Sequence, residues 1–309
     1  MKIVKQKLAV IYHDKCSDGL TAAGIAKYFL EKAGYKDVLY IGGKYHEDPP
    51  ELTDTQIFFV DFCYKRGVMD TLLENQNHIV LIDHHKSAIE DVRELFEHPS
   101  FEPFVSEDNT QSGTGLAWEY FKGRKGINHL PFAFIQDRDL WTWKLPHARE
   151  YLAVHNLRDK TLEEYYKFVV ETIEEEFSTV QLTEVVEKGK AILESQNQIY
   201  DETISSSLRF LSIAGYDNVP TVNCPGYFMS DIGAKLVNTY DVPFALMWYI
   251  SESGMKLGLR SKADHSGADV SIIAKVIHPK GGGHYAASGA MIPTEEFKSN
   301  DFFKTIVGL

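Results

Sequence analysis

Short apolar runs alternate with segments of helical periodicity in the first half of the chain. The apolar runs cover residues 7–12, 56–61 and 78–83, and the helical segments cover 21–32, which Gly34 is placed to end, and about 65–75. Strands of continuous apolar character that are separated by helices are typical of a parallel sheet covered on both faces. We therefore predict a Rossmann-like α/β arrangement for this half.

A mostly helical segment follows and leads into further strand-like runs. Thr161 and Glu164 have the spacing of a capping box before a helix over about 161–177, and helical periodicity returns over 181–205. Later runs predict strands over 208–214, 221–224, 244–250 and 255–261 and helices over 230–238 and 269–277. We expect a first α/β domain over residues 1–180, a connector helix over 181–206, and a smaller mixed-sheet α/β domain over 207–309.

Composition narrows the class of protein. The 309 residues are 44% hydrophobic and 25% charged, as in ordinary globular proteins, and no apolar run approaches the roughly 18 residues of a membrane span. The first residues lack the apolar core of a signal peptide, and three cysteines are too few for a disulfide framework, so a cytoplasmic location without a membrane partner is expected. A net charge of −12 argues against binding long duplex nucleic acid but permits a small anionic substrate.

Candidate metal ligands stand where the predicted elements end. They are His13, Cys16 and Asp18 after the first strand, Asp61 after the second, Asp83-His84-His85 after the third, and Asp137 after the apolar run 132–135. Because ligands of open α/β sheets bind outside the carboxyl ends of the strands, these side chains are expected to meet. Carboxylates and imidazoles suit Mn²⁺ or Mg²⁺, and a pair of such ions needs a bridging carboxylate with terminal ligands on each side.

Each candidate taken alone also has an ordinary structural explanation. An aspartate at a strand end, such as Asp61, is usually a cap or turn residue, and Asp139 is interpreted as an ion-pair or capping neighbour. Isolated histidines are interpreted as surface or hydrogen-bonded residues, namely His46, His78, His98, His129 and His147. The ordered combination of candidates on successive elements nevertheless favours a metal site.

These motifs resemble the DHH phosphoesterases, a family that includes RecJ-type single-strand exonucleases, nano-RNases, cyclic-dinucleotide phosphodiesterases, exopolyphosphatases and family II inorganic pyrophosphatases. The Asp83-His84-His85 signature is preceded by a His-and-Asp motif and an isolated Asp, and is followed by another Asp. In the second half, Arg260 at the end of a strand-like run and the Gly281-Gly282-Gly283-His284 element resemble the DHH-associated domain that many members carry. The resemblance covers nearly the whole chain.

The resemblance implies a role for each matching residue. His13 would hold one ion and Asp61 would bridge to the second, and the remaining ligands would be Asp18, His84 and Asp137. The two ions would be Mn²⁺, with Mg²⁺ or another divalent cation as alternatives. Asp83, which would orient a ligand from outside the coordination sphere, and His85 are the catalytic candidates. Substrate phosphate would be contacted by His85, Arg260, Gly282, Gly283 and His284, since a guanidinium and glycine amides suit an anion.

The first motif departs from the family pattern. Many relatives have His-x-x-x-Asp-x-Asp, whereas this chain has His13-x-x-Cys16-x-Asp18, which is one residue shorter and has Cys where an Asp is expected. In one interpretation a thiolate ligand shifts the metal preference toward zinc or iron. In the other interpretation, which the sequence favours, Cys16 is a small buried residue, and Asp14 or water completes the coordination.

The sequence supports three functions. The first is a manganese-dependent phosphodiesterase that hydrolyses short oligonucleotides or small nucleotides, as an exonuclease does, with water activated by two metal ions. The second is an exopolyphosphatase or other phosphohydrolase without base recognition, whose substrate would be polyphosphate. The third, suggested by Cys16 alone, is a nucleotide-sensing protein with weak or no catalysis. The oligomeric state stays open.

Overall fold

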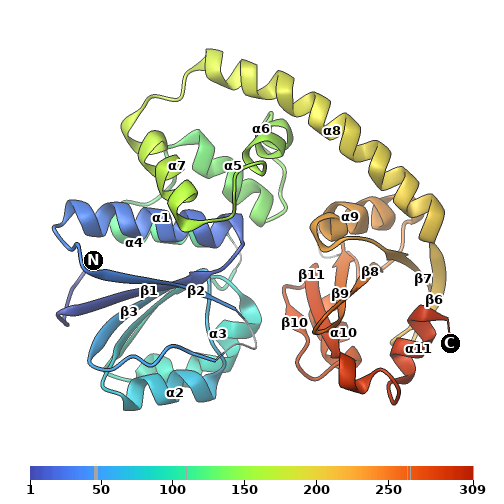
Figure 1. Cartoon of the computed structure of the whole chain (residues 1–309), viewed down its shortest axis with the longest axis horizontal. Helices are drawn as coiled ribbons and strands as arrows, with labels where there is room; N and C mark the ends of the chain where they lie inside the picture. Colours follow the sequence, from blue (N-terminus) through green and yellow to red (C-terminus); the bar gives the residue numbers. More distant parts are fainter. Residues whose placement is uncertain (45–47, 109, 263, 265, 309) are drawn as a thin grey trace. The chain divides into compact units, whose positions relative to one another are not determined.

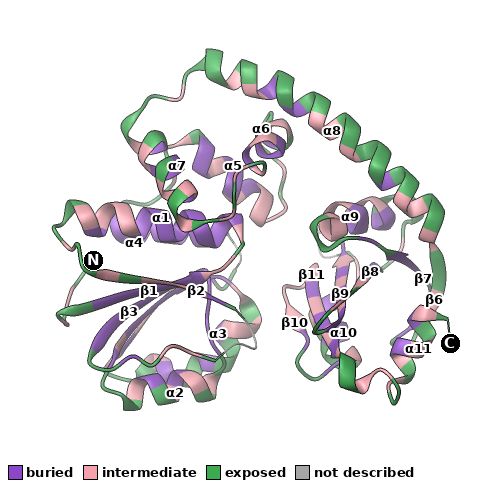
Figure 2. Ribbon diagram, in the orientation of Figure 1, coloured by how far each residue is buried: buried purple, intermediate pink, exposed green. Residues whose placement is uncertain are grey.

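The chain forms two compact units, Met1–Leu193 and Glu194–Leu309. The computed structural model describes residues 1–44, 48–108, 110–262, 264 and 266–308, so His46 lies outside the described residues. The boundary between the units falls within the long helix α8 (Thr179–Ser207), most of whose surface is exposed (Figure 2). The three-part division with a separate connector at 181–206 stays a prediction. Among the described helices, none is long and apolar enough to cross a membrane.

A five-stranded parallel sheet forms the centre of the first unit (Figure 1). Its strands, in spatial order, are β2 (Val38–Gly43), β1 (Lys7–His13), β3 (Thr55–Val60), β4 (His78–Asp83) and β5 (Phe101–Val105). Alternate residues of β1 enter two different cores, with Val10 in one and Ala9 and Ile11 in the other. Because both faces are buried, the central strands read as continuous apolar runs, and the predicted Rossmann-like arrangement is confirmed.

Helices cover both faces of this sheet. The helices α1 (Ser17–Lys32) and α4 (Gly113–Lys122) lie on one face, and α2 (Arg66–Glu74) and α3 (Lys86–Val92) lie on the other (Figure 1). Three further helices extend the first layer: α5 (Leu130–Asp139), α6 (Ala148–His155) and α7 (Leu162–Glu174). Thr161 caps α7 by accepting a hydrogen bond from the backbone amide of Glu164 at 3.3 Å, as its capping-box spacing predicts.

The second unit contains a mixed six-stranded sheet, which confirms the predicted fold class. Its strand order is β10 (Gly282–Gly283), β11 (Ala287–Pro293), β9 (Gly254–Ser261), β8 (Phe244–Ser251), β7 (Tyr216–Asn223) and β6 (Arg209–Ile213). Only the β7–β8 pair is parallel among these described strands. The helices of this unit are α9 (Met229–Tyr240), α10 (Val270–Ile277) and α11 (Asp301–Val307). The strands β10 and β11 were not predicted from the sequence.

The strand order of the first unit brings the candidate metal ligands to one edge of the sheet. The strand β3 pairs with β1 on one side and with β4 on the other, and all three run in the same direction. Their carboxyl ends therefore lie next to one another. This edge of the sheet receives the segments that begin at His13, Asp61 and Asp83.

Candidate metal centre

Asp61 lies at the centre of the candidate site. It follows β3 with a backbone φ of 56°, a left-handed conformation that aspartate tolerates better than most residues. Its carboxylate is 1% exposed, with Oδ1 3.2 Å from Nε2 of His84 and Oδ2 3.6 Å from Nδ1 of His13. Asp61 belongs to three groups of potential metal ligands among the described residues: one with His13 and Cys16, one with Asp18 and His84, and one with Asp83 and His85. Within each group the ligand atoms lie within 4.8 Å of one another.

Asp18 is held by the first turn of α4. Its Oδ1 accepts a hydrogen bond of 2.8 Å from the hydroxyl of Ser112 and one of 3.1 Å from the backbone amide of Thr114. Its Oδ2 is buried, has no hydrogen-bond partner among the described residues, and lies 4.0 Å from Nε2 of His84. Burial of a carboxylate oxygen without a donor is costly, so this atom is suited to a cation.

Two glycines permit the close packing around these carboxylates. A Cβ at Gly113 would lie 2.5 Å from Cβ of Asp61 and 2.8 Å from Oδ2 of Asp18. A Cβ at Gly19 would lie 2.6 Å from the carbonyl oxygen of His13. The first turns of α4 and α1 can therefore approach the strand ends only because these positions lack a side chain.

Asp137 and Asp139, two residues apart on α5, have different partners. Asp137 accepts hydrogen bonds from the backbone amides of Lys144 and Leu145, at 2.9 and 3.0 Å, and from the hydroxyl of Thr142. Its carboxylate thus stabilises the loop after α5 and belongs to none of the ligand groups among the described residues. Asp139 instead directs Oδ2 to within 3.3 Å of Nε2 of His84. Asp139, which the sequence suggested as an ion-pair or capping neighbour, thus pairs with His84 and brings its carboxylate to the other candidate ligands.

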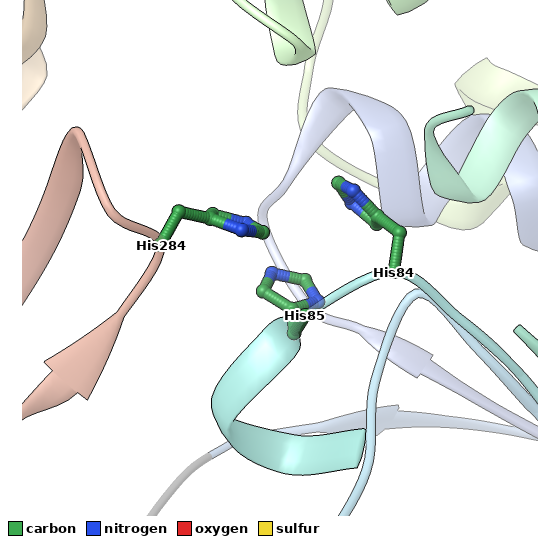
Figure 3. Close-up of side chains that lie close together, drawn as sticks. All are labelled: His84, His85 and His284. Carbon is green, nitrogen blue, oxygen red and sulfur yellow. The ribbon is translucent and has the colours of Figure 1, made fainter. Parts of the chain in front are cut away.

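The Asp83-His84-His85 segment turns sharply after β4. Oδ1 of Asp83 accepts hydrogen bonds from the backbone amides of His84 and His85, at 2.8 and 3.2 Å, and lies 2.7 Å from Nδ1 of His85. Figure 3 shows the two imidazoles side by side, with a distance of 4.8 Å between ring centroids. His84 is buried beside Asp61, whereas His85, which precedes α3, is partly exposed.

Mutual electrostatics shape this cluster. Burial raises the pKa of Asp18 well above its usual value, and the carboxylates of Asp139 and Asp61 raise it further. Burial alone would lower the pKa of His84, but the surrounding carboxylates, led by Asp139, raise it well above its usual value. Burial likewise opposes protonation of His13, yet hydrogen bonds with Asp61 and Cys16 raise its pKa. Asp61 differs: burial would raise its pKa, but hydrogen bonds with His13 and His84 lower it.

The donor set fits a divalent cation. Three carboxylates and one imidazole that are buried or partly buried converge at the strand ends, and the carboxylates repel one another unless the cluster binds protons or a cation. Oxygen and nitrogen donors of this kind suit Mn²⁺, Mg²⁺ and borderline ions. A cation would replace the protons that the raised pKa values of Asp18 and His84 favour.

The stabilising effect of a divalent cation should therefore grow with pH. Groups with a raised pKa in the folded state contribute stability below their unfolded pKa and lose it as pH rises through the folded pKa. For His13 and His84 this loss begins above the ordinary pKa of 6.5. Above that pH the metal-free protein becomes less stable, whereas its affinity for a metal ion increases. We expect the increase in Tm on adding Mn²⁺ to grow between about pH 6 and about pH 9, because each proton released on metal binding adds about 1.4 kcal/mol per pH unit to the free energy of binding.

Thermal unfolding with Mn²⁺ or with chelator tests this expectation. His84→Gln should remove most of the pH dependence, whereas His98→Gln, at an exposed position far from these groups, should leave it unchanged. A metal-induced increase in Tm that is the same across this pH range would contradict it.

The predicted substrate-binding residues all belong to the second unit except His85. Arg260 of β9 donates hydrogen bonds to the hydroxyl of Ser230 and to the carbonyl of Leu259. Gly282 and Gly283 form β10, and Gly283 has a φ of 142°, which residues with a side chain rarely adopt. The backbone amide of His284 donates to the carbonyl of Ala287 at 2.8 Å. Gly283 therefore has a structural reason to be glycine that is independent of any ligand.

Four residues of the site were not predicted. Asp139 stands two residues after a predicted ligand, and Ser112, Gly113 and Thr114 form the start of α4. Ser112 before a run of small residues has the form of a helix N-cap, which was the available signal. Nothing in the sequence indicated that the helix beginning after Ser112 would donate hydrogen bonds to Asp18.

Comparisons with known proteins support the fold. No family model matches the chain. An uncharacterised protein, R106, of Acanthamoeba polyphaga mimivirus is 28% identical over 310 aligned positions, which cover 91% of this chain and 66% of that protein. The chain thus spans slightly less than two thirds of the length of this relative.

Solved structures give a more specific result. The DHH domain of a protein described as a member of the s1p family of ribosomal proteins matches 97% of this chain and 87% of its own length, with a TM-score of 0.57 and 15% identity. A manganese-bound exonuclease RecJ matches 97% of this chain and 90% of its own length, with a TM-score of 0.48 and 14% identity. The chain has the two-domain α/β fold of the DHH proteins. The resemblance stated from its motifs is thereby confirmed at the level of the fold.

Proposed function

We propose that this protein is a metal-dependent phosphoesterase that hydrolyses phosphodiester bonds in short oligonucleotides or small nucleotides. One observation carries the proposal: at the carboxyl edge of the sheet, the carboxylate of Asp61 belongs both to a ligand group with His13 and Cys16 and to one with Asp18 and His84. A carboxylate between two sets of terminal ligands is what a pair of catalytic cations requires. The motif resemblance to the DHH phosphoesterases and the DHH fold support the same assignment.

In this proposal Asp61 bridges two cation positions. His13 belongs to one position, and Asp18 and His84 belong to the other. We assign Asp139 to the second position in place of Asp137, because only Asp139 faces His84. Two divalent cations, Mn²⁺ or another divalent ion such as Mg²⁺, would lower the pKa of water and stabilise the charge that develops on the phosphoryl group.

The side chains outside this set would position the substrate. Asp83 holds Nδ1 of His85, which fixes the orientation of the ring, and the imidazole would contact a phosphate oxygen. Asp83 is thus a positioning residue, and His85 is the residue that we propose to touch the substrate. Arg260, Gly282, Gly283 and His284 are proposed as further phosphate contacts.

The proposal is tested by a panel of substrates with Mn²⁺. The panel contains a 5′-labelled dinucleotide, longer single-stranded RNA and DNA, a cyclic dinucleotide and polyphosphate, each with and without chelator. We expect metal-dependent cleavage of the short nucleotides in preference to the others. Preferential cleavage of polyphosphate would replace the proposal with a phosphohydrolase that does not recognise bases, and metal binding without turnover on any substrate would replace it with a sensing role.

A further inference from the structure

Cys16 occupies a position from which its side chain can bind a cation. It is the residue before α1, has a φ of −92° and a ψ of 135°, and makes no capping hydrogen bond through its side chain. Its sulfur, a ring nitrogen of His13 and a carboxylate oxygen of Asp61 all lie within 4.8 Å of one another. A thiol, an imidazole and a buried carboxylate therefore converge on one point.

The other two cysteines show what a purely structural cysteine looks like in this protein. Cys63 and Cys224 are each 2% exposed and lie in hydrophobic clusters. Cys16 is only partly buried and belongs to none of the described clusters of buried hydrophobic residues. The interpretation of Cys16 as a small core residue therefore does not match its surroundings.

Asp14 is directed away from this point. Its carboxylate carbon would lie 3.0 Å from a Cβ at Gly42 of β2, and its Oδ2 lies 3.9 Å from Nζ of Lys44. Asp14 belongs to none of the ligand groups among the described residues. Of the residues between His13 and Asp18, only Cys16 is placed to act as a ligand.

We propose that Cys16, His13 and Asp61 form a cation position that selects a softer metal ion, such as Zn²⁺, Fe²⁺ or Co²⁺, over Mn²⁺ and Mg²⁺. Thiolate and imidazole ligands prefer such ions, whereas the position of Asp18, His84 and Asp139 is richer in carboxylate and suits harder ions. This inference rests on the proposed pair of cation positions, which share Asp61. It implies that the two positions bind different metals.

Cobalt provides a direct measurement that does not depend on activity. A thiolate bound to Co²⁺ gives a ligand-to-metal charge-transfer band in the near ultraviolet, so Co²⁺ is titrated into the metal-free, full-length protein. We expect the band to saturate at one equivalent, to disappear on adding Zn²⁺, and to persist in excess Mg²⁺. The band should be absent from Cys16→Ser and Cys16→Asp but present in Cys224→Ala, which removes a thiol from the second unit. Circular dichroism verifies that each variant is folded.

The metal preference gives a second, independent measurement. Cys16→Asp replaces the thiol with a carboxylate and should lower the ratio of Zn²⁺ to Mn²⁺ affinity at this position by at least about 10- to 100-fold. Loss of a residue that only hydrogen-bonds to a metal ligand already lowers metal affinity by about this factor. Absence of the band in the wild-type protein, or its persistence in folded Cys16→Ser, would overturn the inference. Phosphodiester hydrolysis without the band refutes only the role of Cys16. The band without hydrolysis of any substrate supports Cys16 as a ligand and refutes only the proposed activity.

Discussion

Replacing Asp61 with asparagine is expected to lower kcat/KM for phosphodiester hydrolysis about a thousandfold or more. Removal of a single preorganised electrostatic contact commonly costs about 10²–10³ in rate, and Asp61 would hold two cations at once. The fold should survive, because asparagine has nearly the same shape and also tolerates the left-handed φ of 56° at this position. The measurement is steady-state hydrolysis of the preferred substrate, together with calorimetric titration of Mn²⁺, which should show weaker binding at both positions.

Asp54 offers a matched control for this substitution. It also has a left-handed backbone, with a φ of 50°, and it precedes the strand that Asp61 follows. Its exposed carboxylate pairs with Lys5 at the surface. Asp54→Asn should therefore retain wild-type activity and metal affinity. If Asp61→Asn hydrolysed the substrate within tenfold of wild type, the bridging role and the two-cation mechanism would both be wrong.

Substitution of Asp137 and of Asp139 should have opposite consequences. Asp139→Asn is expected to weaken Mn²⁺ binding about 10- to 100-fold or more without lowering the Tm of the metal-free protein. Burial raises the pKa of Asp139, and the charge of Asp61 adds to this, so removing its charge relieves repulsion in the absence of a cation. Asp137→Asn should instead lower the free energy of unfolding by about 1–3 kcal/mol, because its carboxylate accepts two backbone amides and a hydroxyl.

The two variants serve as controls for each other, since they make the same chemical change two residues apart on one helix. Thermal unfolding in chelator and calorimetric titration of Mn²⁺ are measured on both. Loss of metal affinity in Asp137→Asn together with normal affinity in Asp139→Asn would restore the ligand set expected from the sequence. It would also require a rearrangement of the loop that Asp137 now holds.

Much of the first unit could be predicted from local pattern. The strands β1, β3 and β4 are buried on both faces, so they read as continuous apolar runs with clear ends. The strands β2 and β5 were not predicted, because each lies at an edge of the sheet and most of its residues are only partly buried. β5 also contains Pro103, which weakens any prediction of a strand and is tolerated at an edge.

The candidate site, like the fold, could be predicted only in part from local sequence. The residues that follow β1, β3 and β4 could be identified because the end of a parallel strand is marked in the sequence and its position in the sheet edge follows from the fold class. The sequence favoured Asp137 over Asp139 as a ligand, but it did not determine which of the two faces the strand ends. Two residues on an α-helix point about 200° apart, and the direction that faces the strand ends depends on how α5 packs on its neighbours.

The hydrogen bonds from Ser112 and Thr114 to Asp18 also could not be predicted from local sequence. These hydrogen bonds join residues 94 and 96 positions apart, and nothing near either end of the contact in the sequence indicates the other. The strand ends, and with them the types of residue at the sheet edge, follow from burial patterns that extend over a few residues. The direction of each side chain at that edge follows from the packing of α1, α4 and α5, because contacts between distant segments determine which face of a helix meets the sheet.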